Sequence, residues 1–415
     1  MLLSMAAGVF TSVQAGAQPG GVLHAAQGQV LDGAANPVQL RCVNLSPWLI
    51  PEPYLIGAGG LRALVSSPTE TRQRLAQLVG AQVAASFWRH WTENFLVAAD
   101  FRHLHELGFN CVRLPLDYRD ILIAPAARAS ALDPQALAPV DRAVRWGATY
   151  GIAVILDLHD APGGQNPQPT AADVPSNDRV ARLWEGPTAA ENQRRTVEIW
   201  GAIAARYARS GSVGGYDLLN EPSLPGDSPP ATLPALYTRI IAAIRARDRV
   251  HMLILEGDRY AHDLSALEGI RDPNVMYEFH EYSILNRAWR NPGQSALAPF
   301  LALRARTGRP LWLGEFGEET LDWQGRMVRL MSANGIGWAV WPWKRVQLGN
   351  GHPVIETIEP PREWTRLARY LTGAWLAHRP SQSEAQRAMQ AMLQAIQTRN
   401  CREDSALARV LSGAR

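Results

Sequence analysis

The sequence has few cysteines, and no block of basic residues or C-x-x-C pair interrupts it. Its 415 residues contain three cysteines, which are too few for a disulfide framework and leave at least one thiol free. We expect Cys42 and Cys111 to be small buried core residues and Cys401 to be a free thiol in the C-terminal tail. The absence of a Cys/His cluster argues against a structural metal site.

Charge and hydropathy exclude several broad classes of protein. Lys and Arg number 41 against 38 Asp and Glu, so the formal net charge of +3 gives no indication of a nucleic-acid partner. Hydrophobic residues make up 47% of the chain and charged residues 19%, which excludes a disordered chain. No run after residue 17 reaches the roughly 18 apolar residues that a membrane span needs.

The N-terminus resembles a targeting segment. Residues 1–17, MLLSMAAGVFTSVQAGA, are apolar and end in small residues, a pattern typical of a secretory signal peptide. A positively charged n-region is missing, and the alternative is a disordered terminus or one that packs into the core. We expect a signal peptide and a secreted or periplasmic protein.

Short apolar runs alternate with longer helical patterns from residue 22 onward. This alternation is typical of repeated βα units, and several runs are hydrophobic throughout, as strands buried on both faces are. The predicted strands cover residues 38–45, 109–114, 152–158, 214–220, 250–256, 275–280, 311–316 and 336–341. The predicted helices cover residues 96–107, 134–149, 188–209, 231–247, 296–307, 321–334 and 361–377, with a short helix at 262–268.

Eight strand–helix alternations favour an α/β fold of the (β/α)8 (TIM) barrel type over an open doubly wound sheet. No G-x-G-x-x-G follows the first strand, as a dinucleotide-binding fold would require. Residues 21–38, with an Asp32-Gly33 turn, predict an N-terminal hairpin that closes the barrel floor. Residues 18–378 would form the barrel domain, and residues 379–415 would append a helix and a polar tail.

Most of the predicted strands end in a polar or aromatic residue. Because the carboxyl ends of barrel strands share one rim, where barrel active sites are built, these side chains should converge. Two long loops, 46–94 and 160–187, follow strand ends on the same rim. The strand-end residues are Arg113, His159, Asn220, Glu221, His280, Tyr282, Glu315 and Trp341.

Glu221 and Glu315 are the acids of this rim that point to a reaction. Buried acids are costly unless they have partners or a chemical role, and strands four and seven face each other across a barrel mouth. Paired carboxyl groups suit glycoside hydrolysis, with retention of configuration if they lie about 5–5.5 Å apart. We expect Arg113 to keep Glu315 ionised and desolvation to keep Glu221 protonated.

These residues also have structural interpretations. The segment Asn220-Glu221-Pro222 is short enough to occur by chance, for instance as a helix-capping turn. Glu315 could be a core ion-pair partner of an arginine. His159 and His280 could be core histidines, or could form a metal site with Asp157. Barrel metallohydrolases usually carry His-x-His on strand one, which is absent here, so we predict no metal and no cofactor.

The motifs around these residues resemble those of glycoside hydrolase family 5, the cellulase family of retaining (β/α)8 glycosidases. The matching segments, in chain order, are RLPLDY, LDLHDAPGGQN, GYDLLNEP, EFHEY, WLGEFG and WAVWPWK. The segment VNLSPWLIPEPYL (43–55) is similar to the opening segment of exo-β-1,3-glucanases in this family.

The resemblance implies a role for each strand-end residue. Glu221 would be the general acid/base and Glu315 the nucleophile, with Arg113 and Tyr282 as hydrogen-bond partners of Glu315. Further implied contacts to the sugar are Asn220 at the 2-hydroxyl, His159 and His280 beside the reacting sugar, and Trp341 beneath it. Trp48, in a predicted rim loop, is a further candidate to stack on a sugar ring.

These observations predict a monomeric retaining hydrolase that acts on a β-linked polysaccharide or oligosaccharide, a β-glucan or a related polymer. A β-mannanase or a glycolipid-glycan hydrolase would use the same residues. A non-catalytic carbohydrate-binding barrel is the alternative from another class, but it predicts the loss of at least one of the two glutamates. The linkage, and endo or exo action, depend on the shapes of the two long loops.

Overall fold

The computed structural model describes residues 21–59, 64–123, 131–347, 352–374 and 377–413. The predicted signal peptide, residues 1–17, lies outside the described residues. Within the described ranges, no helix is both long enough and apolar enough to cross a membrane.

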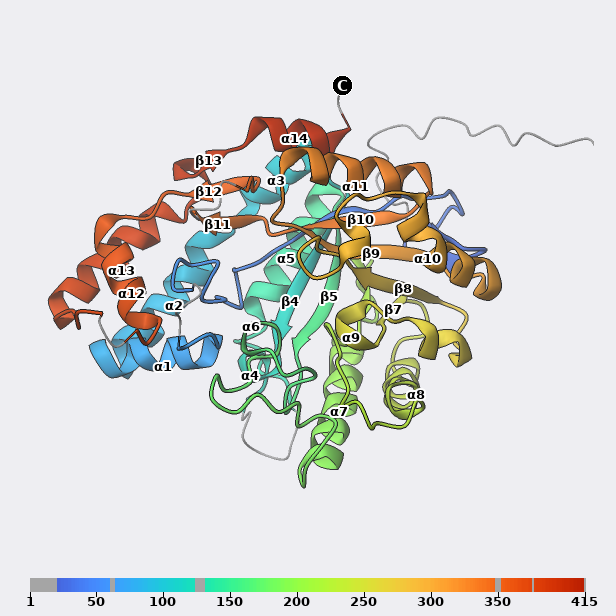
Figure 1. The fold of residues 1–415 in the computed structure, drawn as a ribbon, viewed down its shortest axis with the longest axis horizontal. Helices are drawn as coiled ribbons and strands as arrows, with labels where there is room; N and C mark the ends of the chain where they lie inside the picture. The colour runs from blue at the N-terminus through green and yellow to red at the C-terminus, as the bar shows by residue number, and fades with distance from the viewer. Residues whose placement is uncertain (1–20, 60–63, 124–130, 348–351, 375–376, 414–415) are drawn as a thin grey trace, which may run out of the picture.

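Eight parallel strands form a closed barrel, as the alternating pattern predicts (Figure 1). Consecutive strands along the chain are neighbours, and the last strand pairs with the first. Seven of the eight are buried at every residue, which explains why their sequences are continuous apolar runs. The strands are β3 (Arg41–Asn44), β4 (Cys111–Asp117), β5 (Ala153–Asp160), β6 (Val213–Asp217), β7 (Leu253–Glu256), β8 (Val275–His280), β9 (Leu311–Gly317) and β10 (Gly337–Trp341).

Helices surround the barrel at the predicted positions (Figure 1). Helix α5 illustrates why they form where they do: Pro139 lies in its first turn, and Gly151 ends it in the left-handed conformation. The barrel helices are α3 (Ala98–Glu106), α5 (Ala138–Tyr150), α7 (Ala189–Tyr207), α8 (Thr232–Arg245), α10 (Gln294–Thr307), α11 (Leu321–Ala333) and α12 (Arg362–Leu371), with the short helix η1 (Ser265–Gly269) between β7 and β8.

The N-terminal hairpin closes the barrel floor, as predicted. Strands β1 (His24–Ala26) and β2 (Gln29–Leu31) pair in antiparallel register, and Leu23 and Val30 pack against the inward-facing residues at the bottom of the barrel. The predicted turn at Asp32-Gly33 is present, with the Asp32 carbonyl accepting from the Ala35 N–H. The chain also reverses between β1 and β2 at Gln27-Gly28, where both residues have positive φ, as a two-residue hairpin turn requires.

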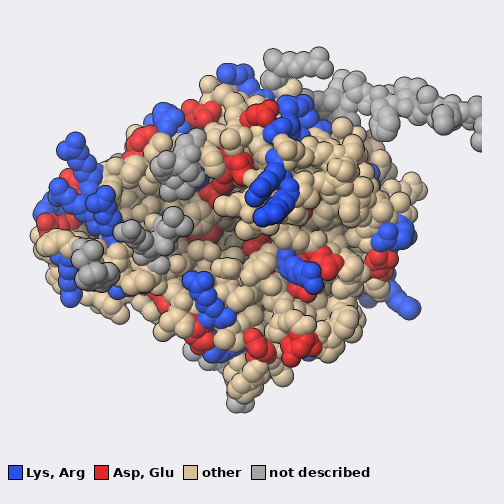
Figure 2. Space-filling model, in the orientation of Figure 1, with Lys and Arg blue, Asp and Glu red and all other residues tan. Residues whose placement is uncertain are grey.

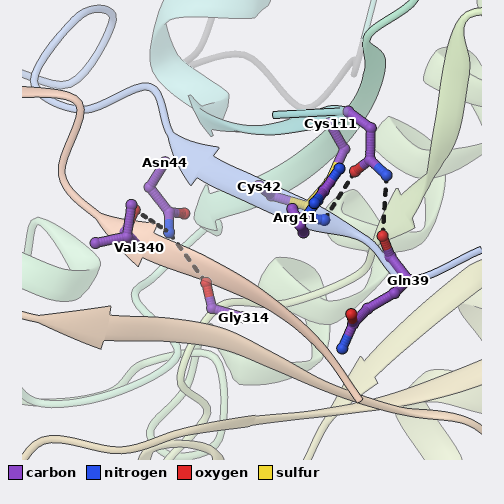
Figure 3. Close-up of a disulfide and its surroundings, with 8 residues drawn as sticks. Gln39, Arg41, Cys42, Asn44, Cys111, Gly314 and Val340 are labelled. Carbon is purple, nitrogen blue, oxygen red and sulfur yellow. Dashed lines mark hydrogen bonds between the residues drawn. A yellow bond between two sulfur atoms is a disulfide. The ribbon is translucent and has the colours of Figure 1, made fainter. Parts of the chain in front are cut away.

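A disulfide joins Cys42 and Cys111 inside the barrel (Figure 3). Both are buried in the core and Cys401 is a free thiol, as predicted, but the sequence analysis did not predict the bond. The two residues are register partners on the adjacent strands β3 and β4, and their Cα atoms lie 4.5 Å apart, within the range that a disulfide spans.

We expect the double variant Cys42→Ala/Cys111→Ala to lose about 4 kcal/mol of unfolding free energy, because the bond closes a 69-residue loop in the unfolded chain. Urea denaturation followed by tryptophan fluorescence would measure the loss. Cys401→Ala, which removes only the free thiol, is the matched control. A double variant as stable as this control would contradict the prediction.

The C-terminal extension packs on the barrel and does not form a separate unit. Helix α13 (Gln382–Ala395), which the sequence predicts, contacts α1 (Pro68–Val79) and α2 (Ala81–Phe95), the two helices within the first long loop (Figure 1). Its start at Ser381 has a capping box with Glu384, so the local sequence sets this boundary.

The polar tail predicted after this helix is folded onto the rest of the protein. Strand β13 (Arg402–Glu403) pairs with β12 (Glu356–Ile358), which also pairs with β11 (Lys344–Val346). Helix α14 (Ser405–Ser412) then packs on α11 and buries Leu407 and Leu411. The tail is polar in composition, but these few apolar positions recur at helical spacing and bury one face.

Candidate active site

A cavity of about 540 Å³ lies where the strands of the barrel end at their carboxyl termini. In Figure 2, Asp and Glu side chains are recessed in a hollow near the centre of the face in view. Residues from β5, β9, β10 and the loops that follow the strands line the cavity. They are Glu52, Tyr54, His159, Gln168, Thr170, Ala171, Glu221, Tyr260, His262, Tyr282, Ile284, Leu285, Glu315, Glu318 and Trp341.

Glu315, on β9, is held at both carboxylate oxygens. Arg113 donates from Nη1 to Oε1 at 2.7 Å, and the hydroxyl of Tyr282 donates to Oε2 at 3.0 Å. Gly314, which precedes it, has to be glycine because a Cβ there would overlap the Glu278 side chain. The carboxylate is therefore fixed in orientation, with one neutral donor and one cationic donor.

Arg113, on β4, is fully buried beneath the cavity and surrounded by carboxylates. It forms ion pairs with Asp217 at 2.8 Å and Glu256 at 3.0 Å in addition to Glu315. Burial opposes its charge, but the charges of the surrounding acids, Asp157 most strongly, outweigh burial and raise the pKa of Arg113. Its guanidinium is consequently a permanent cation at the base of the site.

Glu221, just after β6, is presented to the cavity by an unusual backbone. Its φ is 45°, in the left-handed region that a non-glycine residue adopts at a cost, and functional sites are where such strain concentrates. Its N–H donates to Glu256 Oε2 at 2.6 Å, which holds this conformation. Its Oε1 lies 3.0 Å from Nδ1 of His280.

The two glutamates face each other across the cavity. One carboxylate oxygen of Glu221 and one of Glu315 lie within 4.8 Å of each other and of a ring nitrogen of His280. The same three side chains could in principle hold a transition metal, given their mixed oxygen and nitrogen donors. The Arg113 guanidinium, however, already supplies a cation at hydrogen-bond distance from Glu315.

The pKa values of both glutamates are raised, and in both cases burial is the largest cause. For Glu221 this is the expected direction. For Glu315 the expected effect of Arg113 is present, since the charge of Arg113 lowers the pKa of Glu315, but burial outweighs it. The two carboxyl groups also repel each other when both are ionised, and this favours a state in which only one of them is ionised.

The two histidines of the site are neutral. Burial lowers the pKa of His159 to about 4 and that of His280 to about 3. His159 contacts Asp157 through Nδ1 at 2.8 Å and stacks on Trp341, with ring centroids 5.7 Å apart. The predicted floor residue Trp341 therefore lies in the cavity with His159 beside it, and its indole N–H donates to Tyr54.

The predicted residues are thus brought together, but in two layers. His159, Glu221, Tyr282, Glu315 and Trp341 line the cavity. Arg113, Asn220 and His280 are fully buried below these residues and contact them, and Asn220 accepts a hydrogen bond from Arg113 at 2.9 Å. A direct contact of Asn220 with the sugar stays a prediction.

Trp48 does not reach the cavity. It is buried in the hydrophobic core, where its ring packs near Trp146 and its N–H donates to the carbonyl of Thr92. The prediction that Trp48 stacks on a sugar ring is therefore wrong, and Trp48 is a core residue. The loop that carries it continues directly to the cavity, and Tyr54, six residues later, is the aromatic residue that this loop contributes.

Sequence reasoning missed two acids of the cavity, Glu52 and Glu318. Glu52 is almost fully buried, and its pKa is raised well above the usual range by burial and by the charge of Glu315. Glu318 pairs with Arg345 at 2.7 Å. Glu52 lies within the segment 43–55 and Glu318 directly follows β9, so their positions along the chain could have identified them.

Comparisons with known proteins identify the family to which the chain belongs. The family model described as cellulase (glycosyl hydrolase family 5) matches residues 73–347. A β-xylosidase of Phanerodontia chrysosporium is 29% identical over 77% of this chain and 70% of its own length. Endoglucanase C of Acetivibrio thermocellus is 25% identical over 63% of this chain and 87% of its own length.

A solved structure supports the fold independently. The β-glucanase SdGluc5_26A from Saccharophagus degradans superimposes with a TM-score of 0.51 at 18% identity, over 91% of this chain and 94% of that one. Because the family model spans well over half of the sequence, the family assignment follows from it. The chain is a glycosyl hydrolase and belongs to glycosyl hydrolase family 5.

Proposed function

We propose that the protein is a retaining β-glycosidase in which Glu221 is the general acid/base and Glu315 the nucleophile. The observation that carries this proposal is the pair of facing carboxylates, with oxygens within 4.8 Å of each other. Retaining enzymes place their carboxyl groups about 5–5.5 Å apart, whereas inverting enzymes leave room for a water molecule between them. The separation therefore supports a double displacement.

The nucleophile's partners suit its role. Arg113 and Tyr282 engage one oxygen each and so aim the Glu315 carboxylate at a single point in the cavity. In the first step the carboxylate attacks the anomeric carbon, and the bond to the leaving oxygen breaks. Both donors then remain beside the glycosyl ester and can stabilise the carboxylate when it leaves in the second step.

The position of His280 allows Glu221, the proposed acid/base, to hold a proton. Because His280 is neutral, one ring nitrogen donates and the other accepts. Its Nε2–H donates to Glu278 at 3.0 Å, which leaves Nδ1 to accept from a protonated Glu221. Glu221 gives this proton to the leaving oxygen, and its carboxylate then takes a proton from the water that attacks the glycosyl-enzyme.

We propose a β-glucan, or an oligosaccharide derived from one, as the substrate. The relatives' names refer to β-xylosides and glucans. The cavity offers a stacking surface in Trp341 and polar carboxyl groups in Glu52 and Glu318, and this combination suits a sugar ring with its hydroxyl groups.

A second candidate is a β-glycoside with an apolar aglycone, such as a glycolipid. It is favoured by Ile284 and Leu285, which border the cavity and are 84% and 67% exposed. Large exposed apolar side chains beside a binding site are typical of surfaces that contact an apolar ligand.

A substrate panel separates these candidates. We expect reducing-sugar release from at least one of β-1,3-glucan, β-1,4-glucan, mixed-linkage glucan and their oligosaccharides, with the β-anomer as the first product by NMR. Mannan tests for β-mannanase activity, and an alkyl β-glucoside and a glucosylceramide test the second candidate. Release of the α-anomer first would contradict the retaining mechanism. Activity confined to the lipid-like glycosides would favour the apolar aglycone.

We also propose that the protein is exported to an oxidising compartment. The disulfide between Cys42 and Cys111 supports this, because such bonds form and persist in secreted and periplasmic proteins. The apolar N-terminal segment of residues 1–17 is consistent with the same destination.

A further inference from the structure

A second cluster of carboxylates lies beside the active site and takes no part in the mechanism above. Asp117 ends β4, Asp160 ends β5, and Asp173 directly follows α6 (Pro169–Ala172). One oxygen of each carboxylate lies within 4.8 Å of those of the other two. All three side chains are buried, so the cluster is not an acidic patch exposed to solvent.

Asp160 is the member whose charge the described residues leave uncompensated. Its side chain is 0% exposed, and neither of its carboxylate oxygens has a hydrogen-bond partner among the residues that the structure describes. Burying an ionised carboxylate without a partner is strongly unfavourable. Its neighbours differ: Asp173 accepts hydrogen bonds from Ser67 and Thr69.

The charges of the cluster do not balance. Arg119 pairs with Asp117 and with Asp173 at 2.9 Å each, and no other cation in the described part of the chain forms an ion pair with the three carboxylates. Three carboxylates and one guanidinium leave two negative charges.

We propose that Asp117, Asp160 and Asp173 bind one calcium ion. A single divalent cation would balance the two negative charges and would give both oxygens of Asp160 a partner. The donors are all hard oxygen atoms, with the hydroxyl groups of Ser67 and Thr69 adjacent, and such sets bind Ca²⁺ or Mg²⁺ in preference to transition metals. Calcium fits better because it accepts irregular, buried, protein-supplied oxygen sites, whereas magnesium retains several waters.

The position of the cluster gives this ion a structural effect on the active site. It joins the ends of β4 and β5 to the segment after α6, and Thr170 and Ala171 of that helix line the catalytic cavity. The ion would therefore fix one wall of the cavity. This effect on activity rests on the proposed function, whereas the binding of calcium does not.

The test uses the full-length protein and reads out metal content and thermal stability, which are independent of activity. After treatment with EDTA and readdition of calcium, we expect about one Ca²⁺ per chain by elemental analysis after desalting. Saturating calcium should raise Tm by about 5 °C over the protein in EDTA. Magnesium should produce a smaller shift at the same concentration.

Asp160→Asn assigns the site because it removes the charge and keeps the shape. We expect at least about 100-fold weaker calcium binding and no calcium-dependent rise in Tm. In EDTA its Tm should equal or exceed that of the wild type, because repulsion among the carboxylates is relieved, and this comparison excludes a misfolded variant. Asp227→Asn, at an exposed position, is the matched control and should behave as the wild type.

Two results would overturn the proposal. A wild-type Tm and metal content that do not respond to EDTA or calcium would mean that the carboxylates share a proton instead. An Asp160→Asn variant that binds calcium as tightly as the wild type would place the ion elsewhere in the protein.

Discussion

Glu315→Ala should lower kcat/KM by about 10⁴-fold or more while the protein stays folded. The loss is large because, among the described residues, Glu315 is the carboxylate that accepts hydrogen bonds from both Arg113 and Tyr282. The fold should survive, since Arg113 keeps its contacts with Asp217 and Glu256. Initial rates on an aryl β-glycoside and a thermal melt would measure both expectations.

Azide makes this experiment specific for the nucleophile. A small anion can enter the space that the Glu315 side chain vacates and attack the anomeric carbon directly. With one displacement in place of two, the product should be the α-glycosyl azide, identifiable by NMR. Glu319→Ala is the matched control, because Glu319 lies just after β9 and accepts a hydrogen bond from Ser283 outside the catalytic pair. Full activity in Glu315→Ala would remove Glu315 from the mechanism.

The barrel could be predicted from the sequence because its strands are buried on both faces. Such strands are nearly continuous apolar runs, and each predicted run coincides with a barrel strand. The same property identified Glu221 and Glu315, since a charged residue that interrupts or ends such a run is costly without a function. Closure of the barrel then brought together residues from strands that are far apart in the chain.

Features that depend on the pairing of distant segments were not predictable in the same way. The disulfide requires that Cys42 and Cys111 share a register on neighbouring strands, which composition does not report. Trp48 resembled a rim residue by its position, but burial decided its role. Glu52 and Glu318 lie in loops, where no periodicity shows which side chains point inward.

The aspartate cluster is a further example. Asp117 and Asp160 end adjacent strands, so their proximity follows from the barrel, but Asp173 joins them only because the loop after β5 folds back. The spacing of these aspartates along the chain therefore does not show that all three carboxylates lie close together. The same is true of Arg113, whose carboxylate partners come from several strands.

Glu221→Ala should have an effect that depends on the leaving group. For a natural glycoside, whose leaving oxygen needs a proton, we expect kcat/KM to fall by about 10³-fold, within the range typical of general acid catalysis. For an aryl glycoside with an acidic phenol the first step needs little assistance, so the glycosyl-enzyme should still form and should accumulate. A burst of phenol followed by slow turnover would be the kinetic sign.

The pH dependence and the response to azide then distinguish Glu221 from Glu315. Burial raises the pKa of Glu221, so in the wild type kcat/KM should fall as the pH rises through this raised pKa and the acid loses its proton. That alkaline decline should disappear in Glu221→Ala. Azide should restore turnover by attacking the glycosyl-enzyme and should give the β-glycosyl azide, the opposite anomer to that from Glu315→Ala. If both variants gave the same anomer, the two glutamates could not hold the separate roles that their surroundings indicate. Arg113 and Tyr282 hold Glu315 as an aimed carboxylate, whereas the neutral His280 leaves Glu221 a proton to give.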